Sequence, residues 1–227
     1  MLNTNKKEII INNANLPAGT PPLPNKKYNI IYADPPWTYK DKNCQGNAAQ
    51  HYALMKDSDI CSLPIKDIAA DDCVLFMWAT YPKLKEALDV IEAWGFTYKT
   101  IGFQWVKQNR SGEGHFFGLG RWTRGNTEPC LVATKTPNLI APEDSTAPCL
   151  LATKGKPKRV NASVSQLVFA PLRAHSQKPD EVRDRIVELM GDLPKIELFA
   201  REAFPGWDCW GNEAPTKEEE IDDSWLS

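Results

Sequence analysis

The chain has 227 residues, 42% of them hydrophobic and 25% charged, which is the composition of one soluble domain with its own core. No apolar run reaches the roughly 18 residues of a membrane-spanning helix, and residues 1–15 lack the apolar stretch of a secretion signal. The formal net charge of −2 is unevenly spread, because residues 213–227 carry −5 and the rest of the chain +3. A basic body with an acidic tail indicates either a polyanionic partner or an ordinary solvated surface.

Basic residues gather in two stretches. Residues 151–178 hold six lysines and arginines and no acid, and residues 99–126 hold five against one glutamate. The six cysteines and three histidines are scattered without the spacing of a zinc site, so we expect no metal centre. We expect the cysteines to be reduced thiols of a cytoplasmic protein.

The first part of the chain predicts a lead-in, a strand and a stiff turn. Residues 1–27 are polar and contain four prolines, so we expect a flexible segment. The β-rich run at residues 28–33 stops at Asp34-Pro-Pro, which predicts a strand that ends in a rigid turn. Residues 40–50 lack an apolar period and are expected to form a loop. The continuous apolar run at residues 73–79 predicts a strand that is covered on both faces.

The rest of the chain alternates between helical and strand patterns. Helices are predicted at residues 82–94 and 179–190, each followed by a glycine that ends it. Further strands are predicted at residues 96–106, 130–134, 166–170 and 195–200. This alternation predicts an α/β fold with helices on both faces of one sheet.

One segment of the chain is duplicated. The sequence TEPCLVATK at 127–135 returns as TAPCLLATK at 146–154, and seven of the nine residues are identical. Two copies are too few for a solenoid. We therefore expect one copy to fill a strand of the sheet and the other to form an extra strand or a loop.

The tetrapeptide Asp34-Pro35-Pro36-Trp37 carries the clearest chemical signal, because ligands of open α/β sheets bind at the carboxyl ends of strands. The two prolines remove two N–H donors, so the turn presents the Asp34 carboxylate and the Pro35 carbonyl as acceptors. Such a pair suits an exocyclic amino group, and Trp37 offers a ring on which a base can stack. Two hydrogen bonds from the amine would turn its lone pair toward an electrophilic methyl group, so that orientation and charge placement supply the catalysis. Taken alone, the same tetrapeptide is also compatible with a rigid turn that has no chemical role.

Seven motifs occur in the order found in one known family. They are IIYADPPW at 30–37, VLFMWAT at 74–80, WVKQN at 105–109, EPCLVATK at 128–135, HSQKPDEV at 175–182, KIELFAR at 195–201 and GWDCWGNE at 206–213. On these motifs the sequence resembles the DPPW-type, S-adenosylmethionine-dependent N6-adenine methyltransferases. That family includes the catalytic subunit of the eukaryotic mRNA N6-adenosine methyltransferase and phage and bacterial DNA adenine methyltransferases, and the likeness is closer to the compact phage and bacterial members.

The resemblance implies an α/β, Rossmann-like methyltransferase fold that is circularly permuted, with the catalytic strand ahead of the cofactor strand. This order agrees with the lack of a glycine-rich GxGxxG turn after the first strand. The sequence departs from the family in four places, two of which are a short loop at residues 201–207 and the duplication described above. Glu213 stands where an amide is common, and residues 18–27 offer no clear counterpart of the acid that many members carry before the catalytic strand.

The resemblance also implies site residues, with S-adenosyl-L-methionine as the cofactor and Asp34, Pro35, Pro36 and Trp37 as the catalytic turn. The cofactor contacts of the family match Asp34, Lys178, Glu197, Phe199, Arg201, Asn212 and Glu213. Its substrate side matches Tyr52, Trp78, Trp105 and Lys107. The residues by themselves also allow Glu197 to pair with Arg201, Lys178 to be a solvated residue at a helix start, and the two tryptophans to be core residues.

The leading hypothesis is therefore a methyltransferase that acts on the N6 amine of adenine in DNA, with the target base flipped out of a duplex. The alternatives are the same reaction on RNA and a catalytically silent nucleic-acid-binding subunit, and the intact DPPW motif argues against the second of these. We expect a cytoplasmic bacterial or phage protein that has no membrane partner, with room for a homodimer or a partner subunit. Its expected parts are a flexible lead-in at 1–27, a methyltransferase domain at 28–213 and an acidic tail at 214–227.

Overall fold

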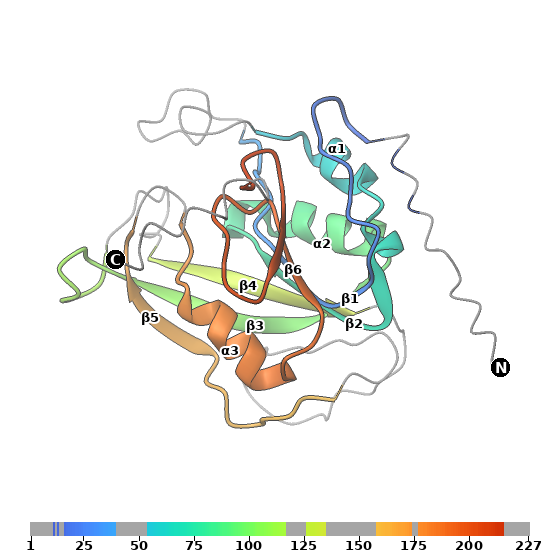
Figure 1. Ribbon diagram of the computed structural model, residues 1–227. Coiled ribbons are helices and arrows are strands. Elements are labelled where there is room, and N and C mark those ends of the chain that lie inside the picture. Colours follow the sequence, from blue (N-terminus) through green and yellow to red (C-terminus); the bar gives the residue numbers. More distant parts are fainter. Residues whose placement is uncertain are drawn as a thin grey trace, which may run out of the picture.

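The computed structural model describes residues 11, 13, 16–39, 54–116, 126–134, 158–173 and 177–215 (Figure 1). The strands in this part of the chain are β1 (Tyr28–Ala33), β2 (Ala69–Trp78), β3 (Thr97–Gln108), β4 (Thr127–Thr134), β5 (Leu167–Pro171), β6 (Lys195–Leu198) and β7 (Asp208–Trp210). The helices are α1 (Asp57–Ser62), α2 (Leu84–Ala93) and α3 (Glu181–Met190), with short 3-10 turns at Ile65–Asp67 and Tyr81–Lys83. None of these helices is long and apolar enough to cross a membrane.

All seven strands belong to one mixed sheet, in the order β5-β3-β4-β2-β1-β6-β7. β4 runs antiparallel to both of its neighbours, whereas every other pair of adjacent strands is parallel. The carboxyl ends of six strands therefore meet at one edge of the sheet, together with the start of β4. We call this the carboxyl edge, and it is where ligands of α/β sheets bind.

The helices cover both faces of the sheet, as the sequence predicted (Figure 1). On one face, Ile31 and Leu75 pack with residues of α1 and α2, such as Val90. On the other face, Tyr32 and Phe76 pack with residues of α3. Neighbouring residues of one strand point to opposite faces, so the unbroken apolar runs of β1 and β2 fill two separate core clusters.

The predicted strands and helices are confirmed, with small shifts at their ends. β1 has the predicted bounds, and β2 begins four residues earlier than its apolar run. The helix predicted at 82–94 begins as a 3-10 turn and continues as α2. Gly95 and Gly191, with φ of 77° and 84°, have the positive φ that glycine adopts readily, and each follows the end of one of these two helices.

Three features of the fold were not predicted. α1 has six residues with only Ile60 buried, and β7 has three residues, so neither is long enough to show a period. The segment before β1 was expected to be flexible, yet Leu23 is only 3% exposed and belongs to a core cluster. This part of the chain is held by specific contacts that the composition of the segment did not indicate.

The first copy of the duplicated segment forms β4, which lies between β2 and β3. The structure thus shows which copy fills the strand. The second copy, at 146–154, lies outside the described residues. The same is true of the loop expected at 40–50, of Tyr52 and of the chain beyond residue 215.

Candidate active site

The turn after β1 is fixed by backbone hydrogen bonds at both prolines. The Trp37 N–H donates to the Pro35 carbonyl at 2.9 Å, and the Met55 N–H donates to the Pro36 carbonyl at 3.0 Å. The Thr38 hydroxyl in turn donates to the Met55 carbonyl at 2.7 Å. The Pro35 carbonyl that we expected to be an open acceptor therefore already holds one donor. Since a carbonyl oxygen has two lone pairs, it can still accept a second hydrogen bond.

Trp37 lies in the core and not on the surface. Its side chain is only 4% exposed, and its indole N–H donates to the Trp78 carbonyl at 3.3 Å. Almost none of the ring is available to a stacked base in this structure, so the stacking role expected of Trp37 is not supported. The ring instead anchors the turn to the end of β2.

Asp34 is held by a lysine that is far away in the sequence. The Lys178 ammonium donates to Asp34 Oδ2 at 2.8 Å, and the two side chains are only 10% and 23% exposed. The same ammonium lies 5.5 Å from the centre of the Trp78 ring. Lys178 is therefore not a solvated residue at a helix start, because its charge lies against the turn after β1.

The ion pair continues into a chain of alternating charges across the carboxyl edge. Glu128, at the start of β4, lies 3.5 Å from Lys178 and 2.5 Å from Lys107 of β3. Burial alone would raise the pKa of the Glu128 carboxyl, but the two lysines outweigh burial and hold its pKa below the ordinary value. Lys107 also lies 5.1 Å from the centre of the Trp105 ring. Four charged side chains from four separate segments thus neutralise one another beside the turn.

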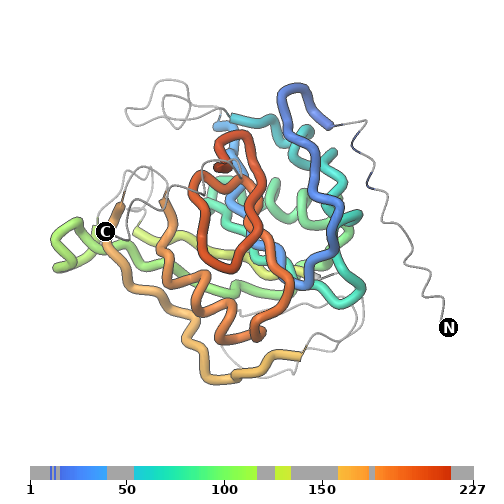
Figure 2. Tube along the Cα trace, in the orientation of Figure 1, coloured from blue at the N-terminus to red at the C-terminus, as the bar shows by residue number. Residues whose placement is uncertain are grey.

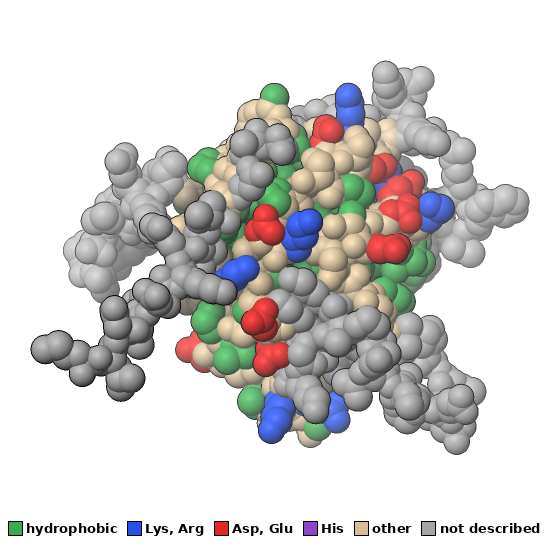
Figure 3. All heavy atoms as spheres, turned by 90° about the vertical axis from the view of Figure 1, so that its right-hand side faces the viewer, with side chains coloured by type: hydrophobic (Ala, Val, Ile, Leu, Met, Phe, Trp, Pro, Cys, Tyr) green, Lys and Arg blue, Asp and Glu red, His purple; other side chains and the backbone are tan. Residues whose placement is uncertain are grey.

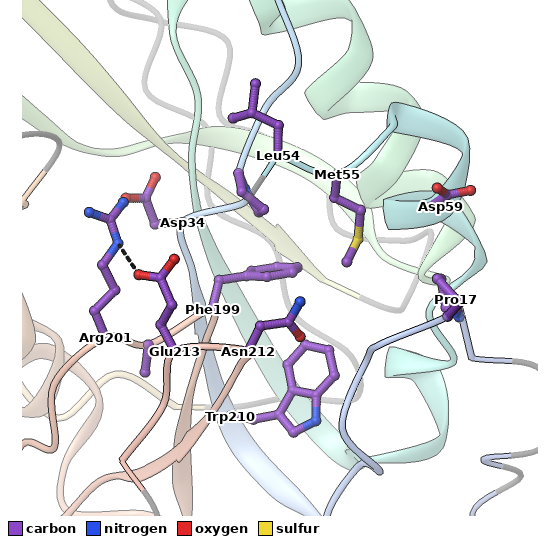
Figure 4. Close-up of a pocket in the computed structure, with 13 residues that line it drawn as sticks. Pro17, Asp34, Leu54, Met55, Asp59, Phe199, Arg201, Trp210, Asn212 and Glu213 are labelled. Atoms are coloured by element: carbon purple, nitrogen blue, oxygen red, sulfur yellow. Dashed lines mark ion pairs between the residues drawn. The ribbon is translucent and has the colours of Figure 1, made fainter. Parts of the chain in front are cut away.

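A cavity of about 220 Å³ opens beside this turn (Figure 4). Figure 4 places Phe199 in the middle of the labelled residues, with Asp34, Arg201 and Glu213 on one side and Pro17 and Asp59 on the other. The lining side chains and backbone come from Pro17, Ala18, Asp34, Pro36, Leu54, Met55, Asp59, Phe199, Ala200, Arg201, Trp210, Asn212 and Glu213. The cavity therefore joins the turn after β1 to the segments that follow β6 and β7.

The floor of the cavity depends on an unusual backbone at the end of β6. Phe199 has a φ of 61°, which is uncommon for a residue with a side chain. Its ring meets the Trp210 ring edge to face, with centres 5.6 Å apart. A Cβ atom at Gly211 would lie 2.9 Å from the Phe199 Cα atom, so this close approach requires glycine.

The polar rim of the cavity consists of Arg201, Asn212 and Glu213, as the resemblance implied for residues near a cofactor. The Arg201 Nε atom lies 3.8 Å from a Glu213 oxygen, and both side chains are partly exposed. The structure therefore brings Asp34, Phe199, Arg201, Asn212 and Glu213 together around one cavity. Lys178 stands behind Asp34 and does not line the cavity.

Glu197 lies apart from this group. It is buried on the α3 face of the sheet, where Arg183 binds both of its oxygens at 2.6 and 2.7 Å. Our alternative of a pair with Arg201 was wrong, because residues 197 and 201 lie on either side of the bend at Phe199. Arg183 also lies 5.7 Å from the centre of the Tyr32 ring, which places the pair within the core.

Trp78 and Trp105 are core residues that support the site. Their side chains are buried, and their indole N–H groups donate to the Tyr32 hydroxyl at 2.6 Å and to the Ala170 carbonyl at 2.9 Å. Each ring contacts one lysine of the charge chain. The assignment of these two residues and Lys107 to the substrate side stays a prediction, and so does that of Tyr52.

Some residues of the site were missed in the sequence. Glu128 lies within a motif that we had recognised, but nothing in one sequence shows that its carboxylate pairs with two distant lysines. Pro17 and Ala18 line the cavity from the segment expected to be a flexible lead-in. Within the described residues, no group of three histidines, cysteines or acids is arranged to hold a metal ion.

The protein has an α/β fold with a cavity at the carboxyl edge of its sheet, the position where ligands of such sheets bind, and comparison with known proteins specifies the family. The sequence model of the MT-A70 family matches residues 28–213. The type II methyltransferase M.MunI of Mycoplasma sp. is 36% identical over 220 residues, which cover 88% of this chain and 84% of the relative. The chain belongs to the MT-A70 family.

Two eukaryotic proteins show a weaker similarity. The N(6)-adenosine-methyltransferase MT-A70-like protein of Drosophila melanogaster is 28% identical over 82% of this chain. The N(6)-adenosine-methyltransferase catalytic subunit METTL3 of Homo sapiens is 27% identical over the same share. The matched region spans only 27% and 28% of the length of these two relatives.

Proposed function

We propose that the protein is an S-adenosylmethionine-dependent methyltransferase that methylates the N6 amine of adenine in DNA. The observation that carries this proposal is the similarity to M.MunI, a type II methyltransferase, over most of both chains. The intact Asp34-Pro-Pro-Trp turn beside a cavity supports an active enzyme over a silent subunit. The permuted, Rossmann-like interpretation fits the chain order, in which the catalytic turn follows β1 and the proposed cofactor segment follows the later strand β6.

The cavity has the chemistry that S-adenosylmethionine requires. Phe199 and Met55 offer apolar surface for a purine ring, and the buried Trp210 supports Phe199 from behind. Asn212 and Glu213 can accept hydrogen bonds from ribose hydroxyls. Lys178 neutralises Asp34, but Asp59 and Glu213 against Arg201 still leave the lining with a net negative charge, which complements a ligand whose sulfonium and ammonium groups outnumber its carboxylate.

When bound, S-adenosylmethionine supplies an electrophilic methyl group. The turn supplies orientation: the Asp34 carboxylate and the second lone pair of the Pro35 carbonyl can accept both protons of an exocyclic amine. A carboxylate has several acceptor positions, so Asp34 can bind the Lys178 ammonium and an amine together. Lys178 is thus a positioning residue, because it fixes the direction of the Asp34 carboxylate.

The charge chain explains how Lys178 stays in place. Glu128 lies 3.5 Å from the Lys178 ammonium that binds Asp34, and Lys107 contacts the other oxygen of Glu128. Four alternating charges at these distances fix one another more tightly than an isolated pair. We therefore assign Glu128 and Lys107 a supporting role behind the turn.

The relatives point to two different nucleic acids as the substrate. M.MunI favours DNA, whereas the two eukaryotic relatives are named as adenosine methyltransferases and favour RNA as the second candidate. We place the protein in the cytoplasm of a bacterium or of a phage-infected cell, with residues 28–213 as the methyltransferase domain. The contribution of a second copy or a partner subunit stays a prediction.

The test is methyl transfer to separate substrates. The protein is incubated with methyl-labelled S-adenosylmethionine and with duplex DNA, single-stranded DNA or RNA of the same sequence, and the digested products are analysed. We expect N6-methyladenine from DNA. Label in RNA alone would replace the DNA assignment, and nucleic acid binding without any transfer would support a silent subunit.

A further inference from the structure

The segment before β1 forms one wall of the cavity. We call residues 16–23 the strap. In Figure 2 the strap, drawn in blue, runs beside the red segment that contains residues 199–215. The family model matches residues 28–213, so the strap lies just before the matched region.

The strap is anchored at its end near β1. Leu23 is buried in the core cluster on the α1 and α2 face. Asn13 binds the backbone of Leu23 on both sides, since its oxygen accepts the Leu23 N–H at 2.9 Å and its amide donates to the Leu23 carbonyl at 3.4 Å. These contacts fix the position of the strap at Leu23, where it joins the core.

Trp210, which lines the cavity, also forms hydrogen bonds to the strap. The Trp210 indole N–H points at two carbonyls of the strap, those of Pro21 at 3.1 Å and Pro22 at 3.2 Å. The Trp210 side chain is only 4% exposed and also lines the cavity. The indole nitrogen can only donate a hydrogen bond, and the strap offers it two carbonyl acceptors. The two carbonyls therefore share this one N–H group.

The far end of the strap turns back at the cavity. The Thr20 N–H donates to the Pro17 carbonyl at 3.0 Å, and Gly19 has a φ of 79° that suits this turn. Pro17 and Ala18 line the cavity there, and Figure 4 shows Pro17 on the side away from Asp34 and Arg201. The prolines limit the freedom of the segment, so little entropy is lost when it is held in place.

We infer that Trp210 is a positioning residue of the cofactor site, because its hydrogen bonds to Pro21 and Pro22 hold the strap against the cavity. This inference rests on the proposed function, because it names S-adenosylmethionine as the ligand. The Trp210 hydrogen bond holds Pro17 and Ala18 against the bound ligand. Affinity for the ligand therefore depends on a contact between two parts of the protein as well as on contacts with the ligand itself.

The experiment compares three variants with the wild type. Trp210→Phe removes the N–H and keeps an aromatic ring, whereas the double variant Pro21→Gly, Pro22→Gly keeps both carbonyls and loosens the strap. Trp94→Phe is the matched control, since the Trp94 N–H donates to the Ile60 carbonyl at 2.8 Å in the core. Calorimetry measures binding of S-adenosylhomocysteine, thermal melting checks the fold, and hydrogen exchange follows the amides of residues 18–20.

We expect Trp210→Phe to weaken binding about three- to tenfold, the effect of losing one hydrogen bond, and the double glycine variant to weaken it about two- to fivefold. In both variants the amides of residues 18–20 should exchange faster, and in the wild type the ligand should slow their exchange. Trp94→Phe should leave both measurements unchanged.

The results separate the two proposals. A wild-type protein that binds no S-adenosylhomocysteine would contradict the proposed function. The hydrogen bond between Trp210 and the strap would still be tested in that case, because hydrogen exchange of residues 18–20 can be measured without ligand. Unchanged exchange at residues 18–20 in Trp210→Phe overturns the inference, even if binding weakens, because the ring alone would then act on the ligand. Unchanged affinity in both variants overturns it as well.

Discussion

Glu128 is held between two lysines, and this arrangement gives the site a dependence on pH. Its folded pKa lies below the ordinary value, so its ionised form stabilises the folded protein. That contribution is complete above the unfolded pKa of about 4.3 and is lost as the pH falls through the lower folded pKa. The carboxylate therefore stabilises the carboxyl edge at neutral pH and stops doing so in acid.

We expect Glu128→Gln to be less stable than the wild type at pH 7, by about 1–2 kcal/mol, because two lysines lose a charged partner. The difference should shrink as the pH falls from about 5 toward 3, since the wild-type carboxyl is then protonated too. Urea unfolding of both proteins across this range measures it. A difference that stays constant with pH would show that the ion pairs contribute nothing.

Because Glu197 is paired with Arg183 in the core, we expect its replacement to reduce the stability of the protein and to leave cofactor binding almost unchanged. Removal of one partner of a buried ion pair costs about 3–5 kcal/mol, so Glu197→Gln should lower the free energy of unfolding by that order. Its affinity for S-adenosylhomocysteine should stay within about twofold of the wild type. Asp89→Asn, which removes an exposed pair with Lys85, is the control. A stable Glu197→Gln variant with lost affinity would return Glu197 to the cofactor contacts.

At the scale of elements, the junction of β6 and β7 shapes the cavity. The left-handed turn at Phe199 ends β6 and separates Glu197, in the core, from Arg201, at the rim. Gly211 lets the segment after β7 lie directly against that turn. The cavity thus depends on two short backbone features that neither strand pattern contains.

We expect Gly211→Ala to lower both stability and affinity, because the added Cβ atom would meet the backbone of Phe199 at 2.9 Å. Overpacking of this kind costs about 1–3 kcal/mol. Gly112→Ala is the control: its φ of 80° is also left-handed, but no atom lies near its Cβ position. Unfolding and calorimetry should show a loss of ligand affinity in Gly211→Ala alone. Equal affinities in the two variants would contradict this account of the cavity.

The long elements could be predicted because their patterns are local. The apolar runs of β1 and β2 and the helical spacing in α3 reflect burial that each segment shows by itself. The cavity residues after β6 came from the family resemblance, since their chemistry is not visible in any period. The strap, α1 and the partners of Glu128 could not be predicted, because they depend on contacts between segments far apart in the chain.

At the scale of the whole molecule, the basic stretch at residues 151–178 does not form one continuous basic surface in the described part of the chain. Two bases of the stretch 151–178 are paired, Lys178 with Asp34 and Arg173 with Asp180. The neighbours Lys158 and Arg159 precede Val160, whose N–H donates to the Leu189 carbonyl at the end of α3 that lies away from the carboxyl edge. On the face shown in Figure 3, charged side chains of both signs are interspersed.

The basic residues that serve DNA should therefore lie at the carboxyl edge. We expect Arg110→Gln to reduce the slope of log affinity against log salt by about 1, since each phosphate contact contributes about 0.9. Lys158→Gln, Arg159→Gln removes two charges at the other edge and should leave the slope unchanged. Fluorescence anisotropy with a labelled duplex measures both. The opposite ranking would place the DNA on the far edge of the sheet.

The central claim is that the turn at Asp34 performs methyl transfer to adenine in DNA. Asp34→Asn keeps the size of the side chain and removes its charge, and Asp89→Asn is the surface control. The measurement is single-turnover transfer of labelled methyl to N6 of adenine in duplex DNA, with folding checked by melting. We predict a loss of at least about a hundredfold in Asp34→Asn and wild-type rates in the control. A folded Asp34→Asn variant that transfers methyl at the wild-type rate would contradict the account.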